Sequence, residues 1–141
     1  MVVNILYANI KNLNERIYTN KSMMKIISLY KKQEKLFGEY NNGKQPDRTD
    51  VYIENVTHEI TDLYIKNGIL KADINFLKNN EHLKKNIDDY VFVTRALGTI
   101  DFLTREVNVE ELFAIDIVLK EYDAYPEQRL REKKIKRVLD I

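Results

Sequence analysis

The chain has 141 residues, 44% of them hydrophobic and 32% charged, with a formal net charge of +1. This composition is typical of one soluble globular domain, and the small net charge favours neither nucleic acid nor a membrane as a partner. The lack of cysteine excludes disulfides, thiol catalysis and zinc-thiolate sites, and no apolar run approaches the roughly 20 residues of a membrane span. Residues 1–4 lack the basic region of a signal peptide, so we expect the protein not to be exported.

The first third of the chain predicts a strand, a helix and a short extended segment. Residues 2–10 are rich in β-branched and aromatic side chains and predict a strand. Asn20 or Ser22 is expected to cap a helix that runs to about Leu36. Its apolar side chains recur at helical spacing and indicate a core-facing stripe of Met23, Ile26, Ile27 and Tyr30. Residues 36–40 predict a short extended segment, and residues 41–50 (NNGKQPDRTD) predict a loop.

The middle of the chain predicts a β-hairpin. Residues 51–65 alternate between apolar and polar side chains, which indicates strand structure in two halves. Asn67-Gly68 is a two-residue hairpin signal, and residues 69–76 predict the return strand. Leu83 and Ile87 lie one helical turn apart within residues 79–89, which predict a short helix.

Residues 90–100 (YVFVTRALGTI) are the stretch around which the rest of the chain is organised. Residues 91–93 form a wholly apolar run that predicts a strand buried on both faces. Arg95 then places a permanent charge at the expected strand end, and Gly98 is expected to allow a turn of the backbone. A buried strand that carries the Thr94 hydroxyl and an arginine to its end is a typical place for a reactive or recognition site.

The last part of the chain predicts a strand and a charged helix. Residues 112–119 are strongly apolar, and Pro126 is expected to open a helix over residues 127–141. This helix carries the basic run 129–137 and is expected to dock through Leu130, Val138 and Leu139, with nucleic-acid contact as the alternative. Strands outnumber helices, so we predict an α+β fold: a mostly antiparallel β-barrel or sheet with surrounding helices. We expect one domain over residues 1–126, followed by the charged C-terminal helix at 127–141.

Four segments, in this order, resemble motifs of one protein family. They are residues 12–18 (NLNERIY), 37–42 (FGEYNN), 53–63 (IENVTHEITDL) and 93–98 (VTRALG), with a weaker fifth match at residues 115–125. In order and spacing the chain resembles the tailed-phage prohead (capsid maturation) serine proteases, which share the herpesvirus assemblin fold. The resemblance spans about residues 2–126 and implies the same barrel-like α+β domain.

The resemblance also implies a catalytic site, at positions where this chain departs from the family. Such a protease needs a serine nucleophile, a histidine base and a third group that orients the histidine. The family serine falls at Val93-Thr94 and the family histidine at Asn42, whose neutral amide cannot take a proton. By resemblance, His58 matches the third-member histidine of the herpesvirus Ser-His-His enzymes, although a strand histidine hydrogen-bonded to a neighbour is more common than a catalytic one. Arg95 is expected to be held by a carboxylate or by backbone carbonyls.

The remaining candidates predict no further chemistry. The acidic pairs Asp88-Asp89 and Glu110-Glu111 are expected to be solvated, and His82 is expected on the surface. Neither metal-ligand spacing nor a glycine-rich phosphate loop is present, so we expect no metal and no cofactor.

Three functional hypotheses follow from the sequence. In the first, catalysis is lost and the chain is a bacteriophage capsid-associated structural or assembly protein. It would be assembled in the host cytoplasm into the procapsid or virion, with capsid or other virion proteins as partners, no membrane partner, and oligomerisation left open. In the second, the chain is an active prohead maturation protease that cleaves scaffold and capsid proteins through Thr94 or an unrecognised serine. Only Ser22 and Ser28 are available for that role, both within the expected first helix. In the third, the chain is a non-viral binding module that resembles the family by chance.

Overall fold

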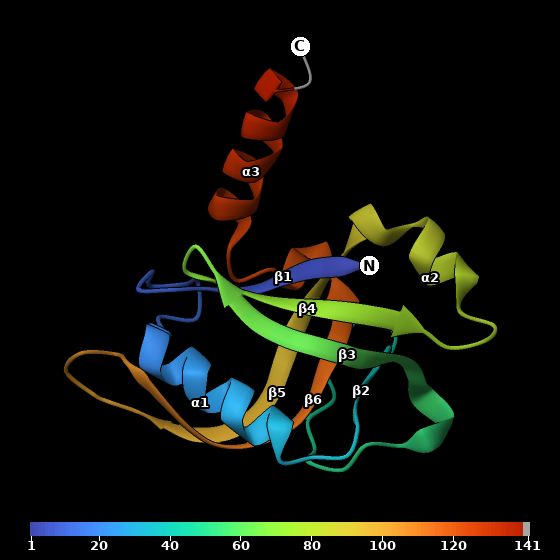
Figure 1. Ribbon diagram of the computed structural model, residues 1–141, viewed down its shortest axis with the longest axis horizontal. Helices are drawn as coiled ribbons and strands as arrows, with labels where there is room; N and C mark the ends of the chain where they lie inside the picture. The colour runs from blue at the N-terminus through green and yellow to red at the C-terminus, as the bar shows by residue number, and fades with distance from the viewer. Residues whose placement is uncertain (140–141) are drawn as a thin grey trace.

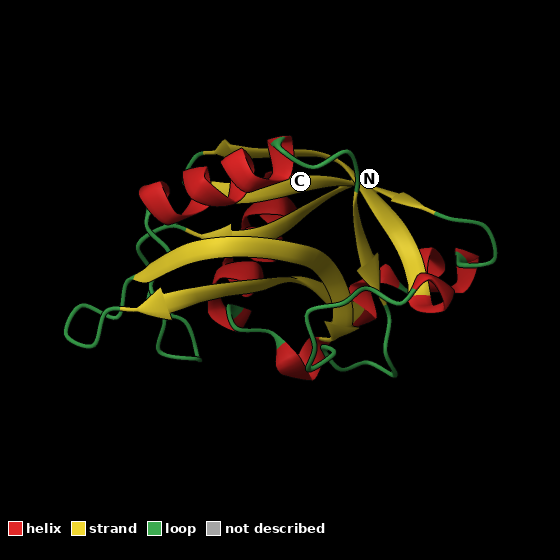
Figure 2. Cartoon of the chain, turned by 90° about the horizontal axis from the view of Figure 1, so that it is seen from below, coloured by secondary structure: helices red, strands yellow, loops and turns green. Residues whose placement is uncertain are grey.

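The computed structural model describes residues 1–139 as two antiparallel sheets and three α-helices (Figures 1 and 2). The larger sheet has the strand order β1 (Val2–Tyr7), β4 (Ile69–Phe76), β3 (Val56–Lys66) and β2 (Leu36–Glu39), and the smaller sheet is the hairpin of β5 (Tyr90–Ile100) and β6 (Val107–Leu119). The helices are α1 (Asn20–Lys31), α2 (Glu81–Lys85) and α3 (Pro126–Leu139), with single 3-10 turns at Ile53–Asn55, Ile87–Asp89 and Lys120–Tyr122. The predicted mostly antiparallel α+β class is confirmed.

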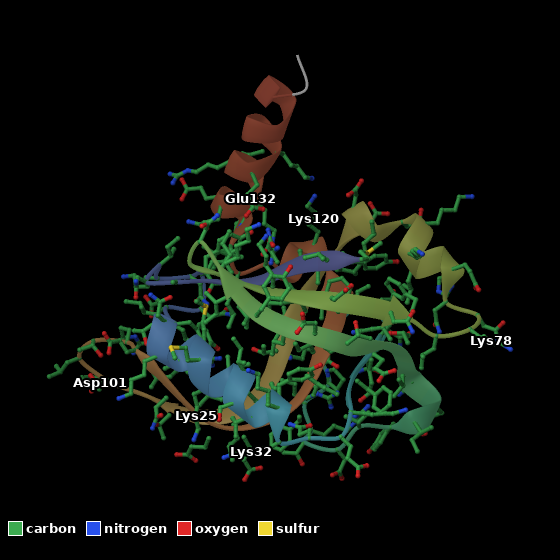
Figure 3. The ribbon with its side chains drawn as sticks, viewed as in Figure 1. Lys25, Lys32, Lys78, Asp101, Lys120 and Glu132 are labelled. Carbon is green, nitrogen blue, oxygen red and sulfur yellow. The ribbon has the colours of Figure 1, made fainter. Side chains whose placement is uncertain are left out.

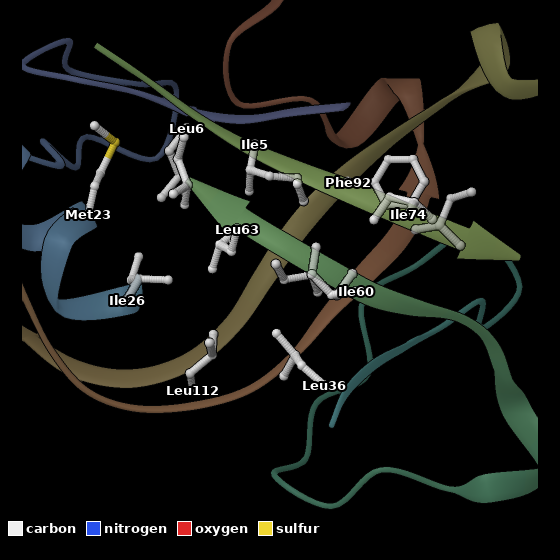
Figure 4. Close-up of a cluster of buried hydrophobic side chains, with 14 of the residues drawn as sticks. Ile5, Leu6, Met23, Ile26, Leu36, Ile60, Leu63, Ile74, Phe92 and Leu112 are labelled. Carbon is white, nitrogen blue, oxygen red and sulfur yellow. The ribbon is translucent and has the colours of Figure 1, made fainter. Parts of the chain in front are cut away.

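The two sheets meet along β2 and β6 and enclose one core. Beyond the end of β2, Tyr40 forms a parallel bridge with Ile117, and the Gly43 carbonyl accepts a hydrogen bond from the backbone N–H of Leu119 at 2.9 Å. In the view of Figure 1, the β5–β6 hairpin crosses behind strands β3 and β4 at a steep angle. Apolar side chains of both sheets and of α1 fill the space between them (Figure 4), including Ile5, Met23, Ile26, Leu36, Ile60, Leu63, Ile74, Phe92 and Leu112.

Helix α1 is capped one residue before Asn20, the first of the two expected caps, and it ends before the expected boundary. Thr19 is the N-cap, and it forms a reciprocal capping box with Ser22. The predicted stripe is confirmed, since Met23 and Ile26 are fully buried. The helix ends at Lys31, not near Leu36, because Leu36 is the first residue of β2 and pairs with Ile60 of β3.

The Asn67-Gly68 hairpin is confirmed, whereas the first half of the predicted 51–65 strand is wrong. Asn67 and Gly68 have φ angles of 54° and 74°, as a type I′ turn requires. Strand β3 starts only at Val56, after the 3-10 turn of residues 53–55. The backbone N–H of Tyr52 instead donates to the Glu39 carboxylate at 3.3 Å, so the chain approaches Glu39 before it joins the sheet. The predicted helix over 79–89 is likewise shorter, as α2 followed by a 3-10 turn.

The β5–β6 hairpin is longer than predicted, and Gly98 does not form its turn. Gly98 lies within β5, paired with Val109, and a Cβ atom there would lie 2.2 Å from the Asn108 carbonyl oxygen. The position therefore needs glycine for close strand contact. Arg95 lies in mid-strand, and only Val91 and Phe92 of the expected fully buried run are buried, since Val93 is partly exposed.

Helix α3 is tied to the body through its polar residues. Arg129 forms an ion pair with Asp123 at 2.9 Å and donates to the Asn4 carbonyl at 2.9 Å, and the Asn4 side chain donates to Glu132 at 3.0 Å. Docking through Leu130 is wrong, because 54% of that residue is exposed. The side chains of Val138 and Leu139, also expected to dock, lie outside the described residues. No helix in residues 1–139 is both long enough and apolar enough to span a bilayer.

Candidate functional site

Arg95 lies in a largely buried cluster with three other charged side chains, Glu39, Asp116 and Arg48. The Arg95 guanidinium meets Asp116 through two bonds of 3.0 Å and Glu39 through one of 2.8 Å. Its remaining N–H groups donate to the backbone carbonyls of Arg48 at 3.3 Å and Asp50 at 2.9 Å. All five N–H donors of the guanidinium therefore have acceptors. The expectation that Arg95 is held by carboxylates and carbonyls agrees with these contacts.

Arg48, which lies in the loop of residues 41–50, is the fourth member of the cluster. Its guanidinium forms a two-bonded pair with Glu39 at 2.7 and 2.8 Å, and its carbon lies 3.5 Å from the centre of the Tyr52 ring. Two arginines thus face two carboxylates, and the cluster is neutral. Such a pairing offsets the large cost of burying charge, because each carboxylate oxygen has a charged donor.

The two carboxylates respond differently to this environment. Burial by itself would raise the pKa of Glu39, but the hydrogen bonds from Arg48 and Arg95 outweigh it and lower the pKa to about 2. Burial raises the pKa of Asp116 above its ordinary value, against the opposing effect of Arg95. Glu39 is therefore the more firmly ionised of the two partners.

Two β-bulges bring the cluster together. The register of β2 against β3 shifts between Gly38 and Glu39, and the register of β5 against β6 shifts between Arg95 and Ala96. Bulges of this kind redirect a side chain relative to the alternation of its strand. Sequence reasoning missed Glu39, Arg48 and Asp116 as site residues. Asp116 did carry a signal, because it is the one acidic residue within the apolar run 112–119 and a buried carboxylate needs a partner.

His58 lies in the core beside the cluster. Its Nε2 is 2.7 Å from the Ile115 carbonyl oxygen and its Nδ1 is 2.7 Å from the Thr57 hydroxyl. A carbonyl can only accept, so Nε2 carries the proton and Nδ1 accepts from Thr57. The ring packs edge-on against Phe92, with centroids 5.2 Å apart. A Cβ atom at Gly38 would lie 2.2 Å from Nε2, so glycine makes room for the ring between β2 and β6.

The surroundings of His58 keep the ring neutral. Burial lowers the pKa of His58 to about 4, although the hydrogen bond to the Ile115 carbonyl acts in the opposite direction. The only basic atom of this tautomer is Nδ1, and the Thr57 hydroxyl already occupies it. In this arrangement His58 is a satisfied core histidine and has no free lone pair for a second hydroxyl.

Val93 and Thr94 lie on β5, across β6 from His58. Thr94 pairs with Ile115 and Val93 pairs with Asp116. Both residues line an open cavity of about 260 Å³, together with Tyr18, Gln45 and Tyr125. Gln45 donates to the Thr94 carbonyl at 2.8 Å. Among the side chains that the structure describes, no hydrogen bond joins the Thr94 hydroxyl to His58.

Asn42 is not brought to the other predicted site residues. It occupies an exposed turn with a φ of 52°, and its neighbour Gly43 contacts β6 at Leu119. Leu119 lies four positions along β6 from Ile115, or about 13 Å at about 3.3 Å per residue. The structure therefore brings Val93, Thr94, Arg95 and His58 around residues 115–116, and it places Asn42 elsewhere.

Other candidate nucleophiles and bases have separate positions. His82 is exposed on α2, Ser28 is exposed on α1, and the Ser22 hydroxyl donates to the Val107 carbonyl beside its capping box. In the described part of the chain, no group of three or more His, Asp or Glu side chains is arranged to hold a metal ion.

The fold around this site resembles that of a phage protease of known structure. A solved structure with the same fold is that of the bacteriophage T4 capsid assembly protease, gp21, with a TM-score of 0.70 and 22% sequence identity. The match covers 84% of this chain and 79% of that one. No protein-family model matches the chain, and no curated protein matches it by sequence. The likeness is therefore one of fold.

Proposed function

We propose that the chain is a bacteriophage procapsid or virion protein that uses a prohead-protease fold for assembly and does not cleave peptides. The fold likeness to a capsid assembly protease supports the assembly role. The observation that carries the loss of catalysis is the state of His58, whose ring nitrogens are both occupied within the core. Capsid or other virion proteins are the partners that this proposal implies.

The chemistry of hydroxyl attack also supports the proposed loss of catalysis. A threonine or serine hydroxyl becomes an effective nucleophile when a base within hydrogen-bond reach takes its proton. Base assistance is worth about 10²–10⁴-fold in rate. Thr94 has no such contact with His58 among the described side chains, and Asn42 carries an amide. In place of a catalytic pair, the region holds a neutral ionic cluster that fastens the loop of residues 41–50 to β5 and β6.

The alternative is an active maturation protease that rearranges when it meets its substrate. The open cavity beside Thr94 favours this alternative, because it would admit a peptide. The alternative requires the His58 ring to break its hydrogen bonds to Ile115 and Thr57 and to move past β6 toward Thr94. Both proposals share the fold and the capsid partners, and they differ in whether those partners are cleaved.

A second interaction is proposed for α3. Arg131 and Lys133 are exposed on this helix, next to the charged residues that continue its sequence. Nucleic-acid binding there would be electrostatic and would weaken steeply with salt. A filter-binding assay with duplex DNA at low and high salt tests it, and binding that does not depend on salt would contradict it.

The decisive experiment incubates the chain with the scaffold and capsid proteins of the same phage. We expect the chain to sediment with the assembled shells while all the partner proteins remain intact on a gel. Thr94→Ala should behave like wild type in both measurements. Discrete fragments that disappear in Thr94→Ala or His58→Ala would establish the protease instead. Failure to sediment with shells, with no cleavage, would contradict the capsid assignment itself.

A further inference from the structure

The turn between β5 and β6 presents two apolar side chains to solvent in a fixed conformation. Phe102 is 84% exposed and Leu103 is 88% exposed. The Asp101 carboxylate holds the turn by accepting hydrogen bonds from the backbone N–H groups of Leu103 and Thr104, both at 2.9 Å. The backbone N–H of Arg105 donates to the Asp101 carbonyl at 2.8 Å. A turn ordered in this way loses little conformational freedom when it binds.

The charges beside these two side chains are acidic. Asp101 and Glu106 are exposed, and the nearby cation Arg105 is turned back to the Glu15 carbonyl at 3.0 Å. Hydrogen bonds from the backbone of Thr104 and Leu103 lower the pKa of Asp101, so it stays ionised. We call Asp101, Phe102, Leu103 and Glu106 the turn patch.

The base of α3 combines apolar side chains with basic ones. A hollow of about 170 Å³ is lined by Lys120, Asp123, Pro126, Arg129, Leu130 and Lys133. Asp123 and Arg129 neutralise each other at 2.9 Å, which leaves apolar Pro126 and Leu130 between two lysines. Side-chain contact with Lys133 lowers the pKa of Lys120, with burial and the charge of Lys133 acting in the same direction, so a further carboxylate beside the two lysines would be favourable. We call this feature the α3 hollow.

The two features lie on different sides of the molecule. Figure 3 shows Asp101 at the far end of the β5–β6 hairpin and Lys120 beneath α3, close to Glu132. A single chain therefore cannot bring its own turn patch into its own α3 hollow.

We propose that the turn patch of one chain docks into the α3 hollow of a second copy. Phe102 and Leu103 would cover Pro126 and Leu130, while Asp101 and Glu106 would meet Lys120 and Lys133. The residues at this contact come from different surfaces of the two copies, so the association is head-to-tail and generates a ring or a filament. The inference does not depend on whether the protein cleaves peptides.

The contact is weak between two free chains. A turn of this size covers much less than the roughly 1,600 Å² that a stable protein complex buries. We therefore expect association that grows with protein concentration and weakens with added salt, because exposed charge pairs are screened.

Sedimentation velocity on the full chain, from micromolar to millimolar concentration, tests the proposal. Wild type should associate at low salt. A turn variant, Phe102→Ser with Leu103→Ser, and a hollow variant, Leu130→Ser with Lys133→Glu, should each associate at least about tenfold more weakly, since each loses apolar surface that the contact would bury. A mixture of the two variants should form a one-to-one dimer and nothing larger, because one intact turn patch and one intact α3 hollow remain.

The matched control is Ile53→Ser, which removes a side chain that is 87% exposed and lies in neither feature. It should associate like wild type. Glu106→Lys changes a single exposed charge and serves as a milder turn variant, and thermal melts establish that each variant is folded. A monomeric wild type at millimolar concentration, a turn variant that associates normally, or a mixture that stays monomeric would each overturn the proposal. If wild type is monomeric but only the turn variant fails to sediment with capsid shells, a capsid protein covers the turn patch and the second copy is excluded.

Discussion

His58 donates its Nε2 proton to the carbonyl oxygen of Ile115 at 2.7 Å, in the space that Gly38 leaves open between β2 and β6. This contact fixes the tautomer of the ring, and the Thr57 hydroxyl then occupies the remaining nitrogen. The histidine that the motif order would assign to catalysis therefore acts as a hydrogen-bonded spacer between strands. Its protonation would place a positive charge in the core, which burial opposes.

The first prediction concerns the pH dependence of folding. The pKa of His58 is about 4 in the folded chain and about 6.5 when exposed. Because the unfolded chain binds a proton first, the free energy of unfolding should fall as the pH drops from about 6.5 to about 4 and level off below that. The loss attributable to His58 is about 3 kcal/mol at about 1.4 kcal/mol per pKa unit. Urea denaturation at a series of pH values measures it.

The control for this prediction is the second histidine. His58→Gln should remove this part of the pH slope, whereas His82→Gln, at an exposed position, should keep it. Equal slopes in wild type and His58→Gln would show that His58 titrates normally in the folded chain.

The second prediction concerns Arg95. Arg95→Met should destabilise the chain by about 3–5 kcal/mol, because it leaves Glu39 and Asp116 without their shared cation in the interior. Arg105→Met is the matched control, since Arg105 is partly exposed and its closest ion-pair distance is 3.7 Å, to an exposed Glu15. That change should cost about 1 kcal/mol or less. Equal shifts in the urea midpoints of the two variants would show that the cluster contributes no more than a surface pair.

The third prediction concerns the hairpin turn at Gly68. Its φ of 74° lies in the left-handed region, and a Cβ atom there would meet nothing closer than Ala8 at 3.7 Å. The cost of Gly68→Val is therefore conformational and should be about 1–2 kcal/mol in a thermal or urea melt. Gly68→Asn should cost less, because asparagine tolerates this conformation. A Gly68→Val protein as stable as wild type would contradict the importance of the turn.

The fourth prediction concerns reconstruction of the protease site by sequence motif. Asn42→His combined with Thr94→Ser should not generate a reactive serine, because Gly43, next to residue 42, bonds to Leu119, whereas Thr94 pairs with Ile115. A fluorophosphonate probe, which labels activated serines, should label the double variant no more than Thr94→Ser alone. Stronger labelling of the double variant would show that the turn at residues 41–44 can move to β5.

Sequence patterns predicted the parts of this fold that depend on local signals. The Asn67-Gly68 turn and the apolar stripe of α1 were recognisable because φ preference and helical spacing are encoded within a few residues. The site was harder to predict because it depends on register. Two bulges redirect Glu39 and Arg95, and the partner Arg48 comes from a loop that no local rule places. Gly98 was misread because close packing against Asn108 and a turn both favour glycine.

The hydrogen bonds from Arg95 to the loop of residues 41–50 have a consequence for protein engineering. Its guanidinium donates hydrogen bonds to the main-chain carbonyls of residues 48 and 50. This attachment of the loop therefore does not depend on the side chains at Asp47, Thr49 or Asp50. All three positions are exposed. Foreign peptide sequence could therefore be grafted there while Arg48 and the carbonyl positions are kept. The loop then becomes a display site, and its anchor lies in the core of the protein.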